Sequence, residues 1–176
     1  MDFYDASLIL VGMPGAGKST IGLLLAKELA KDFIDTDLLI QLREKKTLQE
    51  IVNQDGYQKL REIEEQILLS TDYPNHIIAT GGSAVYSSAG MAHLKHYGLV
   101  VFLDVALDEL HKRIQNYDTR GIARRPDQSF EELFAERRAL YQGYADIVIE
   151  CGEKNPFDVV QEIIYEVGET YAEIDS

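Results

Sequence analysis

The sequence predicts an α/β fold in which a mostly parallel sheet is built from strands that alternate with helices. Short apolar runs alternate with stretches of helical period along almost the whole chain, which is typical of βαβ units. A length of 176 residues suits one core, so we expect a single domain over residues 1–176. The hydrophobic fraction of 45% and the charged fraction of 27% are near globular averages, which disfavours a disordered or membrane protein.

Five apolar runs have the length of strands, and five other stretches have the period of helices. The predicted strands are residues 7–12, 32–36, 76–80, 98–104 and 145–150. The predicted helices are residues 18–30, 47–52, 57–70, 107–115 and 157–171. Ser129 begins a further helix, because Glu132 three residues later completes a capping box. Residues 116–128 have no period and include Gly121 and Pro126, so they are predicted to form a loop.

The net charge of −13 disfavours nucleic acids and anionic membranes as partners, because both require broad basic surfaces. Seven of the 17 basic residues nevertheless fall between Lys112 and Arg138, which makes this stretch a candidate anion site. The one cysteine, Cys151, cannot form an internal disulfide, and a buried free thiol fits a reducing compartment. Residues 1–5 are acidic, unlike a signal peptide, and the apolar run 8–11 is too short to span a bilayer. We therefore expect a cytoplasmic protein.

Residues 12–19 read GMPGAGKS and match the phosphate-binding motif G-x-x-x-x-G-K-S in full, with a predicted strand before it and a predicted helix after it. Glycines let backbone N–H groups turn toward phosphate oxygens, and the helix N-terminus adds favourable partial charge. Lys18 can reach the β- and γ-phosphates of ATP, and the Ser19 hydroxyl can bind Mg²⁺. The alternative is an ordinary glycine-rich turn before a helix. On the first interpretation, the ATP-binding residues are Gly12, Gly15, Ala16, Gly17, Lys18 and Ser19.

Two carboxylates follow the second predicted strand, at its carboxyl end, where ligands bind in open parallel sheets. Alternation along the strand sends Asp35 and Asp37 to the same side, where they could serve a metal ion and a substrate hydroxyl. The alternative is that Asp37 only caps a helix starting at Leu38. Asp104 ends an apolar strand in the manner of a Walker B acid, but no second acid accompanies it, and we interpret it as a cap at the strand end.

Arg137 interrupts an apolar helical stripe and must meet an anion, because burying an unpaired guanidinium is very costly. That anion is either a protein carboxylate or a ligand, whereas Arg138 is interpreted as a solvated surface charge. The stripe consists of Phe130, Leu133, Phe134, Leu140, Tyr141 and Tyr144.

The remaining candidate charges lie on one helix and on the unpatterned loop. Arg61 and Glu64 are one helical turn apart, and on residue chemistry alone they form a surface pair of little energetic value. Arg120, Arg124 and Arg125 lie in the loop, where a mobile arginine can close over a transferring phosphoryl group. The alternative is a charged, solvated loop.

The stretch of the chain that contains these candidate residues, roughly residues 7–167, resembles the shikimate kinase family. That family has the nucleoside-monophosphate-kinase-like P-loop fold. The aspartate pair, the R-x-x-E spacing and the paired glycines are together far more specific than the P-loop motif alone. The matching segments, in chain order, are residues 12–20, 35–37, 55–56, 61–64, 80–82, 125–126, 137–146 and 155–156.

The resemblance implies how a small anionic acceptor with a hydroxyl group is bound. Arg61 and Arg137 would grip its carboxylate, and Glu64 would orient Arg61. Gly81 and Gly82 would offer backbone N–H groups nearby. Asp37 would bind the acceptor hydroxyl and act as its base.

The resemblance also implies the nucleotide side of the site. Ser19 and Asp35 would organise Mg²⁺, the latter through water. Arg125 would be the lid arginine, so that Lys18, Asp37 and Arg125 form the catalytic set. The resemblance adds four residues to the expected ATP-binding set, namely Thr20, Arg113, Arg125 and Pro156. Arg113 and Pro156 would lie on either side of adenine.

Several positions depart from the family pattern near the acceptor and in the lid. Ser83 replaces a third glycine, Leu60 replaces a phenylalanine, and Ala139 replaces a proline. Arg113 and Arg125 are twelve residues apart, which indicates an insertion.

The resemblance therefore implies a three-layer α/β/α P-loop NTPase fold with the strand order 2-3-1-4-5, a helical substrate flap at about residues 38–71 and a lid loop at about residues 116–128. The activity it implies is transfer of the γ-phosphate of ATP, with Mg²⁺, to the 3-hydroxyl of shikimate by a monomer. One alternative is a related kinase for another small hydroxylated acid or polyol. The other is a nucleotide-binding module without turnover, which intact Lys18, Ser19, Asp35 and Asp37 disfavour.

Overall fold

The computed structural model describes residues 5–70, 72–114 and 119–174, and its centre is a five-stranded parallel sheet. The strand order is β2-β3-β1-β4-β5, which confirms the predicted order. All five predicted strands are present, within two residues of their predicted ends. Their bounds are β1 Ser7–Val11, β2 Asp32–Asp35, β3 His76–Ala79, β4 Gly98–Asp104 and β5 Ile147–Glu150.

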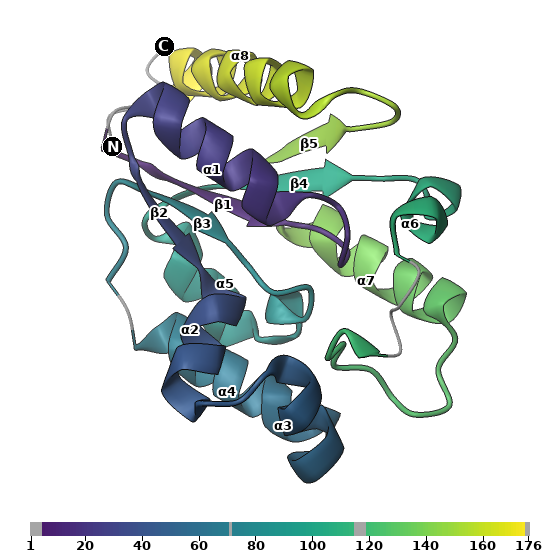
Figure 1. Cartoon of the computed structure of the whole chain (residues 1–176). Helices are drawn as coiled ribbons and strands as arrows, with labels where there is room; N and C mark the ends of the chain where they lie inside the picture. Colours follow the sequence, from purple (N-terminus) through teal and green to yellow (C-terminus); the bar gives the residue numbers. More distant parts are fainter. Residues whose placement is uncertain (1–4, 71, 115–118, 175–176) are drawn as a thin grey trace.

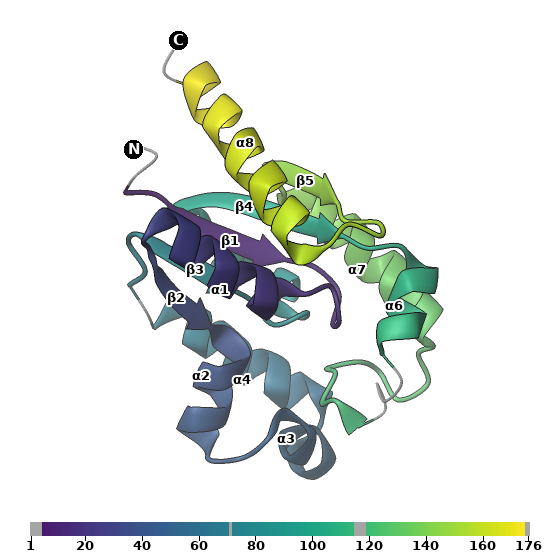
Figure 2. The ribbon, with the colours of Figure 1, turned by 45° about the horizontal axis from the view of Figure 1, so that its top comes forward.

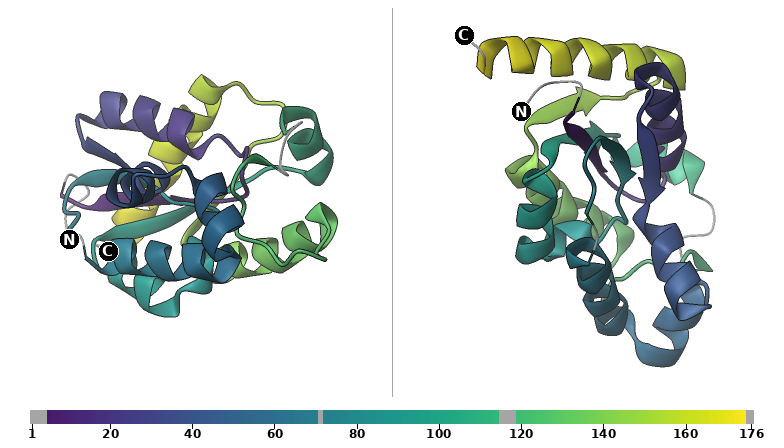
Figure 3. Two further views of the ribbon diagram at one scale, coloured as in Figure 1. Left: turned by 60° about the horizontal axis from the view of Figure 1, so that its bottom comes forward. Right: turned by 90° about the vertical axis from the view of Figure 1, so that its left-hand side faces the viewer.

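Helices cover both faces of the sheet, so the fold has the three layers that the sequence predicts (Figure 1; Figure 3). On one face, α1 (Lys18–Leu29) packs on β1, β2 and β3, and α8 (Pro156–Ile174) packs on β5 and on α1. On the other face, α5 (Ser88–Lys95) and α7 (Phe130–Tyr144) pack on β4. β1 is buried at all five residues because it lies at the centre of the sheet between these layers.

Three helices after β2 form a second, smaller core at one end of the sheet (Figure 2). They are α2 (Thr36–Glu44), α3 (Leu48–Asp55) and α4 (Tyr57–Leu69), in the region predicted as the substrate flap. Ile40, Ile51 and Ile63 contribute to this core, and so does Ala123 from the loop before α7. The flap and the loop are therefore packed together. The backbone N–H of Gly121 also donates to Gln49 Oε1 at 2.7 Å.

The junction between β2 and α2 differs from the predicted one. Thr36 begins the helix instead of ending the strand, and the N-cap is Asp35, which accepts hydrogen bonds from the backbone N–H groups of Asp37 and Leu38. Asp37 is therefore inside the first turn of α2, and the interpretation of Asp37 as the helix cap is wrong. Its side chain is left free for another role.

Other differences arise where the sequence pattern is weak. Residues 84–95 form the short 3₁₀ helix η1 (Ala84–Tyr86) and α5, which were not predicted, because only Met91 and Leu94 mark a buried face on α5. α6 is Leu107–Arg113; residues 115–118, at the end of the predicted helix and the start of the predicted lid, lie outside the described residues. The capping box of Ser129 and Glu132 is confirmed. Among the described residues, no helix has both the length and the apolar character needed to cross a membrane.

Candidate active site

The P-loop lies between the end of β1 and the start of α1, and its backbone has the conformation that a phosphate cradle requires. Gly15 and Gly17 have φ of 83° and 95°, which side chains disfavour. Gly17 is the N-cap of α1 and has no side chain that could accept a hydrogen bond. The first N–H groups of the helix are therefore left without a side-chain acceptor from this residue. The sequence motif therefore forms an anion-binding helix terminus.

Lys18 is almost fully buried within this loop. Its Nζ donates to the carbonyl oxygens of Gly12 at 2.7 Å and Met13 at 2.9 Å. Burial lowers the pKa of Lys18 to about 8, and the charge of Asp37 opposes that change. An ammonium held by two neutral carbonyls in a buried site gains from a phosphate, which would restore its preference for the charged form.

Ser19 and Asp35 meet at the mouth of the P-loop. The Ser19 hydroxyl donates to Asp35 Oδ2 at 2.5 Å, while Asp35 Oδ1 caps α2. These two hard oxygens fit Mg²⁺, which prefers oxygen ligands and keeps several waters and substrate phosphates in its shell. No group of three or more His, Cys, Asp or Glu side chains suited to a metal ion occurs within the described ranges, so a bound Mg²⁺ would depend on the nucleotide for its other ligands.

Two carboxylates converge beside Gly81. A Cβ atom at Gly81 would lie 2.3 Å from Glu64 Oε1 and 2.5 Å from Asp37 Oδ1, so a side chain at this position would have to displace both carboxylates. Burial raises the pKa of Asp37 to about 6, and the charges of Lys18 and Arg137 oppose the change. Burial and the charge of Asp37 raise the pKa of Glu64 to about 7. The charges of Lys18 and Arg137 favour the ionised form of both carboxylates, and at Asp37 the charge of Lys18 is the largest of these effects.

Gly81 and Gly82 are required for close approach more than as hydrogen-bond donors. The N–H of Gly81, expected to face a substrate, donates to Thr36 Oγ1 at 3.0 Å. A Cβ at Gly82 would lie 2.7 Å from Arg137 Nη1. The Gly82 carbonyl accepts from the Tyr141 hydroxyl at 2.6 Å.

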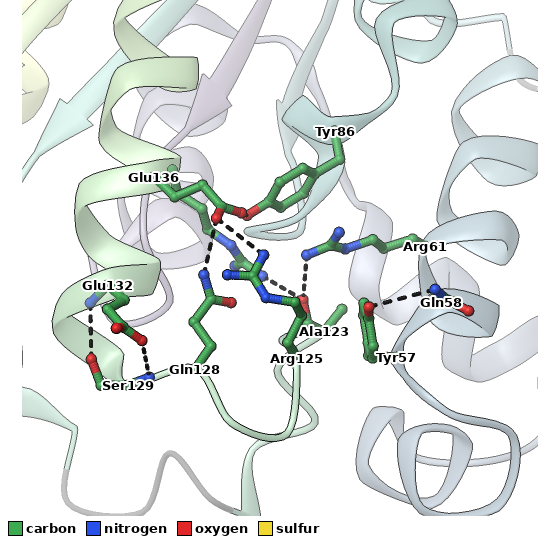
Figure 4. A network of polar contacts seen from close by, with 11 residues as sticks. Tyr57, Gln58, Arg61, Tyr86, Ala123, Arg125, Gln128, Ser129, Glu132 and Glu136 are labelled. Atoms are coloured by element: carbon green, nitrogen blue, oxygen red, sulfur yellow. Dashed lines mark hydrogen bonds and ion pairs between the residues drawn. The ribbon is translucent and has the colours of Figure 1, made fainter.

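Arg61 and Arg137 converge on one oxygen, as the resemblance implies for a carboxylate site. Figure 4 shows Arg61 and the Ala123 oxygen that it contacts. Both guanidiniums donate to the backbone oxygen of Ala123, at 3.0 Å and 2.9 Å. Arg137 is 1% exposed, and within the described part of the chain no carboxylate lies within ion-pair distance of either guanidinium. Their buried Nε atoms also lack a partner there. The arrangement favours a ligand anion over a protein carboxylate as the partner of Arg137.

Glu64 does not make the expected contact with Arg61. Its Oε2 accepts a hydrogen bond from the hydroxyl of Ser83, the residue that replaces a family glycine, and its Oε1 has no partner among the described residues. The Arg61 guanidinium instead lies over the ring of Tyr86, 3.6 Å from its centroid, with the Tyr57 ring at 5.1 Å. Tyr86 was not predicted as a site residue, because no sequence pattern marks it.

The three loop arginines occupy different surroundings. Arg120 lines the main cavity together with Lys18 and Asp37. Arg125, expected to be the lid arginine, forms an ion pair with Glu136 at 3.3 Å outside the cavity lining, and its side chain is 49% exposed. Arg124 Nη1 donates to the Gln128 carbonyl. The structure thus brings Arg120 to the phosphate cradle and leaves Arg125 at its margin.

Two adjoining cavities meet at the P-loop. The main one, of about 430 Å³, joins the P-loop to Asp37, Glu64 and Arg137. The smaller one, of about 240 Å³, lies between Arg113 and Pro156, the pair expected to hold adenine. Its lining also includes four residues that were not predicted as part of the site, namely Ile21, Cys151, Lys154 and Val159.

Asp104 and Arg138 form an ion pair that the sequence did not predict. Asp104 caps no helix: α6 has Ala106 as its N-cap, without a side-chain hydrogen bond. Arg138 donates to both oxygens of Asp104, at 3.2 Å and 2.7 Å. Arg138 is a surface charge, as predicted, because its side chain is 41% exposed, but it has a partner in Asp104. The pair links α7 to the end of β4.

A phosphate cradle between β1 and α1, on a parallel sheet of the order β2-β3-β1-β4-β5, defines a P-loop phosphotransferase. A family model described as shikimate kinase matches residues 14–168. The chain belongs to the shikimate kinase family, whose members transfer phosphate to a hydroxyl group.

Relatives of known name agree with the family match. Shikimate kinase of Nitrosospira multiformis is 38% identical over 160 residues, covering 89% of this chain and 82% of the relative. Shikimate kinase of a Sulfurihydrogenibium species is 34% identical, covering 92% and 97%.

Solved structures extend the comparison to the fold. The shikimate kinase of Acinetobacter baumannii in complex with shikimate has a TM-score of 0.85, with 28% identity over 94% of each chain. The shikimate kinase of Aquifex aeolicus has a TM-score of 0.77, with 29% identity over 94% and 98%. A thymidylate kinase from Candida albicans, with a TM-score of 0.58 and 16% identity, shares the fold alone.

Proposed function

We propose that the protein transfers the γ-phosphate of ATP to the 3-hydroxyl of shikimate. The observation that carries the proposal is the convergence of Arg61 and Arg137 on the backbone oxygen of Ala123. Ala123 and Arg137 line the cavity that also holds Asp37 and the P-loop. Two guanidiniums from different helices match a planar carboxylate, which arginine binds bidentately. The family match and the shikimate complex of a relative support the same acceptor.

On the nucleotide side, the P-loop N–H groups and Lys18 would hold the β- and γ-phosphates, and Arg113 and Pro156 would enclose adenine. Ser19 and Asp35 would hold Mg²⁺, which when bound neutralises charge on the transferring phosphates. Little covalent chemistry is asked of the protein itself, because phosphoryl transfer is promoted mainly by positioning and charge.

On the acceptor side, Asp37 would accept the hydroxyl proton as the oxygen attacks the γ-phosphorus. A pKa of about 6 leaves Asp37 ionised at neutral pH while keeping it basic enough to take that proton. The acceptor carboxylate would replace the Ala123 carbonyl between the two arginines. Displacing that carbonyl would move the loop that also carries Arg120. Because Arg120 lines the cavity and Arg125 does not, we assign Arg120, in place of Arg125, as the arginine that acts on the transferring phosphoryl group.

A second candidate acceptor is another small hydroxylated acid. Ser83 motivates it, because its hydroxyl lies in the acceptor end of the cavity, where the family pattern has no side chain. The proposal keeps the expectation of a monomer that acts in the cytoplasm, and of ATP and one small acid as its substrates.

The test is shikimate-dependent release of ADP by the purified protein in the presence of Mg²⁺. We expect turnover that Lys18→Ala removes while the circular dichroism spectrum stays unchanged, because Lys18 binds phosphate and contributes little to the core. Product analysis by ³¹P NMR would identify the hydroxyl that is phosphorylated. Near-normal turnover by a folded Lys18→Ala variant, or no turnover of shikimate by the wild type, would overturn the proposal.

A further inference from the structure

The orientation of Arg61 depends on an aromatic ring instead of a carboxylate. Its guanidinium lies 3.6 Å from the ring centroid of Tyr86, a close cation–π contact (Figure 4). The Arg137 guanidinium lies 5.5 Å from the same centroid. Glu64, the acid on the same helix as Arg61, is engaged by Ser83 instead. Tyr86 therefore contacts both arginines that face the acceptor.

The ring of Tyr86 is itself held in place by α7. Its hydroxyl donates to Glu136 Oε1 at 2.5 Å. That hydrogen bond is the main reason that the pKa of Glu136 is lowered, so Glu136 is an ionised acceptor. This hydrogen bond holds the outer end of the ring in place, so the ring is kept beside Arg61.

The same carboxylate also binds the loop before α7. Glu136 Oε2 accepts from Gln128 Nε2 at 3.0 Å and pairs with Arg125 Nη1 at 3.3 Å (Figure 4). Glu136 thus connects Tyr86, which contacts Arg61, to the loop before α7. The Ala123 carbonyl of that loop lies between Arg61 and Arg137. The chain of contacts runs from the loop through Glu136 and Tyr86 to Arg61.

We propose that Tyr86 is a positioning residue that aims Arg61 at the acceptor carboxylate, and that Glu136 fixes Tyr86 for this role. This inference rests on the proposed function. It assigns to an aromatic face, supplied by η1, the orienting role that the resemblance gives to Glu64. A guanidinium oriented by a ring keeps its N–H groups free for the substrate, whereas a carboxylate partner would occupy some of them.

The expected effects follow from the strength of a cation–π contact. Tyr86→Leu removes the ring and should raise the KM for shikimate by roughly 2- to 30-fold, the range of such contacts between exposed and desolvated sites. The KM for ATP should stay within about twofold, because Tyr86 does not line either part of the nucleotide site. Tyr86→Phe keeps the ring and should have a smaller effect.

A purely structural role of Tyr86 would weaken the reaction of charged and neutral acceptors alike. The test therefore also compares shikimate with its neutral carboxamide. We expect the ratio of kcat/KM for shikimate to that for its carboxamide to fall in Tyr86→Leu by the same factor as the KM rises. The matched control is Tyr97→Leu, a half-buried tyrosine at the opposite end of the sheet from the cavity, next to the start of β4. It should leave that ratio unchanged.

A second series compares two variants that both keep an aromatic ring at position 86, so that a difference between them does not come from a loss of folding. Trifluorophenylalanine placed at position 86 has nearly the shape of phenylalanine but a weaker negative ring face, so its KM for shikimate should exceed that of Tyr86→Phe. An equal KM in these two, or an equal loss for shikimate and the carboxamide in Tyr86→Leu, would overturn the inference while leaving the proposed function intact. A wild type inactive on shikimate would instead overturn the proposed function.

Discussion

Arg61 on α4 and Arg137 on α7 donate to the same backbone oxygen, that of Ala123, although 76 residues separate them. One carbonyl oxygen between two guanidiniums lies where an acceptor carboxylate would bind. The loop before α7 therefore supplies a neutral substitute for the ligand. A carboxylate forms stronger, charge-assisted hydrogen bonds and should displace the carbonyl.

The two arginines should act on acceptor binding as one unit. Arg61→Ala and Arg137→Ala should each raise the KM for shikimate by about ten- to a hundredfold, since each charge-assisted contact contributes roughly 1.5–3 kcal/mol. The double variant should lose less than the sum, because both side chains bind the same group. Steady-state kinetics would measure this.

The matched control is Arg138→Ala, which neighbours Arg137 in sequence but pairs with Asp104. It should leave the KM for shikimate nearly unchanged. Strict additivity of the two clamp variants, or an effect confined to the KM for ATP, would contradict the shared carboxylate.

The loop arginines should differ in their effect on the chemical step. Arg120 lines the cavity, so Arg120→Ala should lower kcat by about 10²-fold or more, the scale expected when an arginine that neutralises transition-state charge is lost. Arg125→Ala removes an exposed ion pair with Glu136 and should have a much smaller effect. Single-turnover kinetics would compare them with Arg124→Ala. A larger loss at Arg125 would restore the assignment made from sequence.

The rate of transfer should depend on the ionisation of Asp37. Because burial raises the pKa of Asp37 to about 6, kcat/KM for the acceptor should rise with pH through about 6 and then level off. Asp37→Asn keeps the shape and should lower kcat by about 10²-fold or more while ATP affinity holds. A pH profile that is flat between pH 5 and 7 in the wild type would argue against Asp37 as the base.

The buried Glu64 should make the stability of the fold depend on pH. Its pKa is raised from 4.5 to about 7, so the folded protein retains a proton that the unfolded chain releases above about pH 4.5. The free energy of unfolding therefore falls as pH rises from 4.5 to 7. Glu64→Gln should reduce this fall by about 1–3 kcal/mol.

Urea denaturation at pH 5 and pH 8 would measure the difference, with Glu62→Gln on the exposed face of the same helix as the control. If the pH dependence of the free energy of unfolding is the same in Glu64→Gln and the wild type, Glu64 is already ionised in the folded protein at pH 5. The pKa of Glu64 is then not raised by burial, and the prediction is wrong.

The sequence was sufficient for the sheet and the P-loop, because both depend on local patterns. The period of the apolar residues predicts all five strands, and the strand-to-helix context of residues 12–19 predicts the cradle. It also singled out Arg137, because a guanidinium inside an apolar stripe conflicts with its surroundings. Such conflicts between local pattern and burial are visible in one sequence.

The sequence could not predict the partners of these charges. Whether Glu64 binds Arg61 or Ser83 depends on how η1 packs against α4, and η1 has no periodic signal. The choice between Arg120 and Arg125 depends on the path of a loop, which Gly121 and Gln49 fix through a contact between distant residues. Pairing across the fold is set by tertiary packing.

The central claim is that the protein recognises its acceptor by a carboxylate held between Arg61 and Arg137. The most direct test is kcat/KM of the wild type, at saturating ATP and Mg²⁺, for shikimate and for a neutral cyclic polyol with the same ring hydroxyls. The account predicts that shikimate is preferred by about 10²-fold or more, the value of two charge-assisted contacts. Efficient phosphorylation of the neutral polyol with shikimate inert would contradict it.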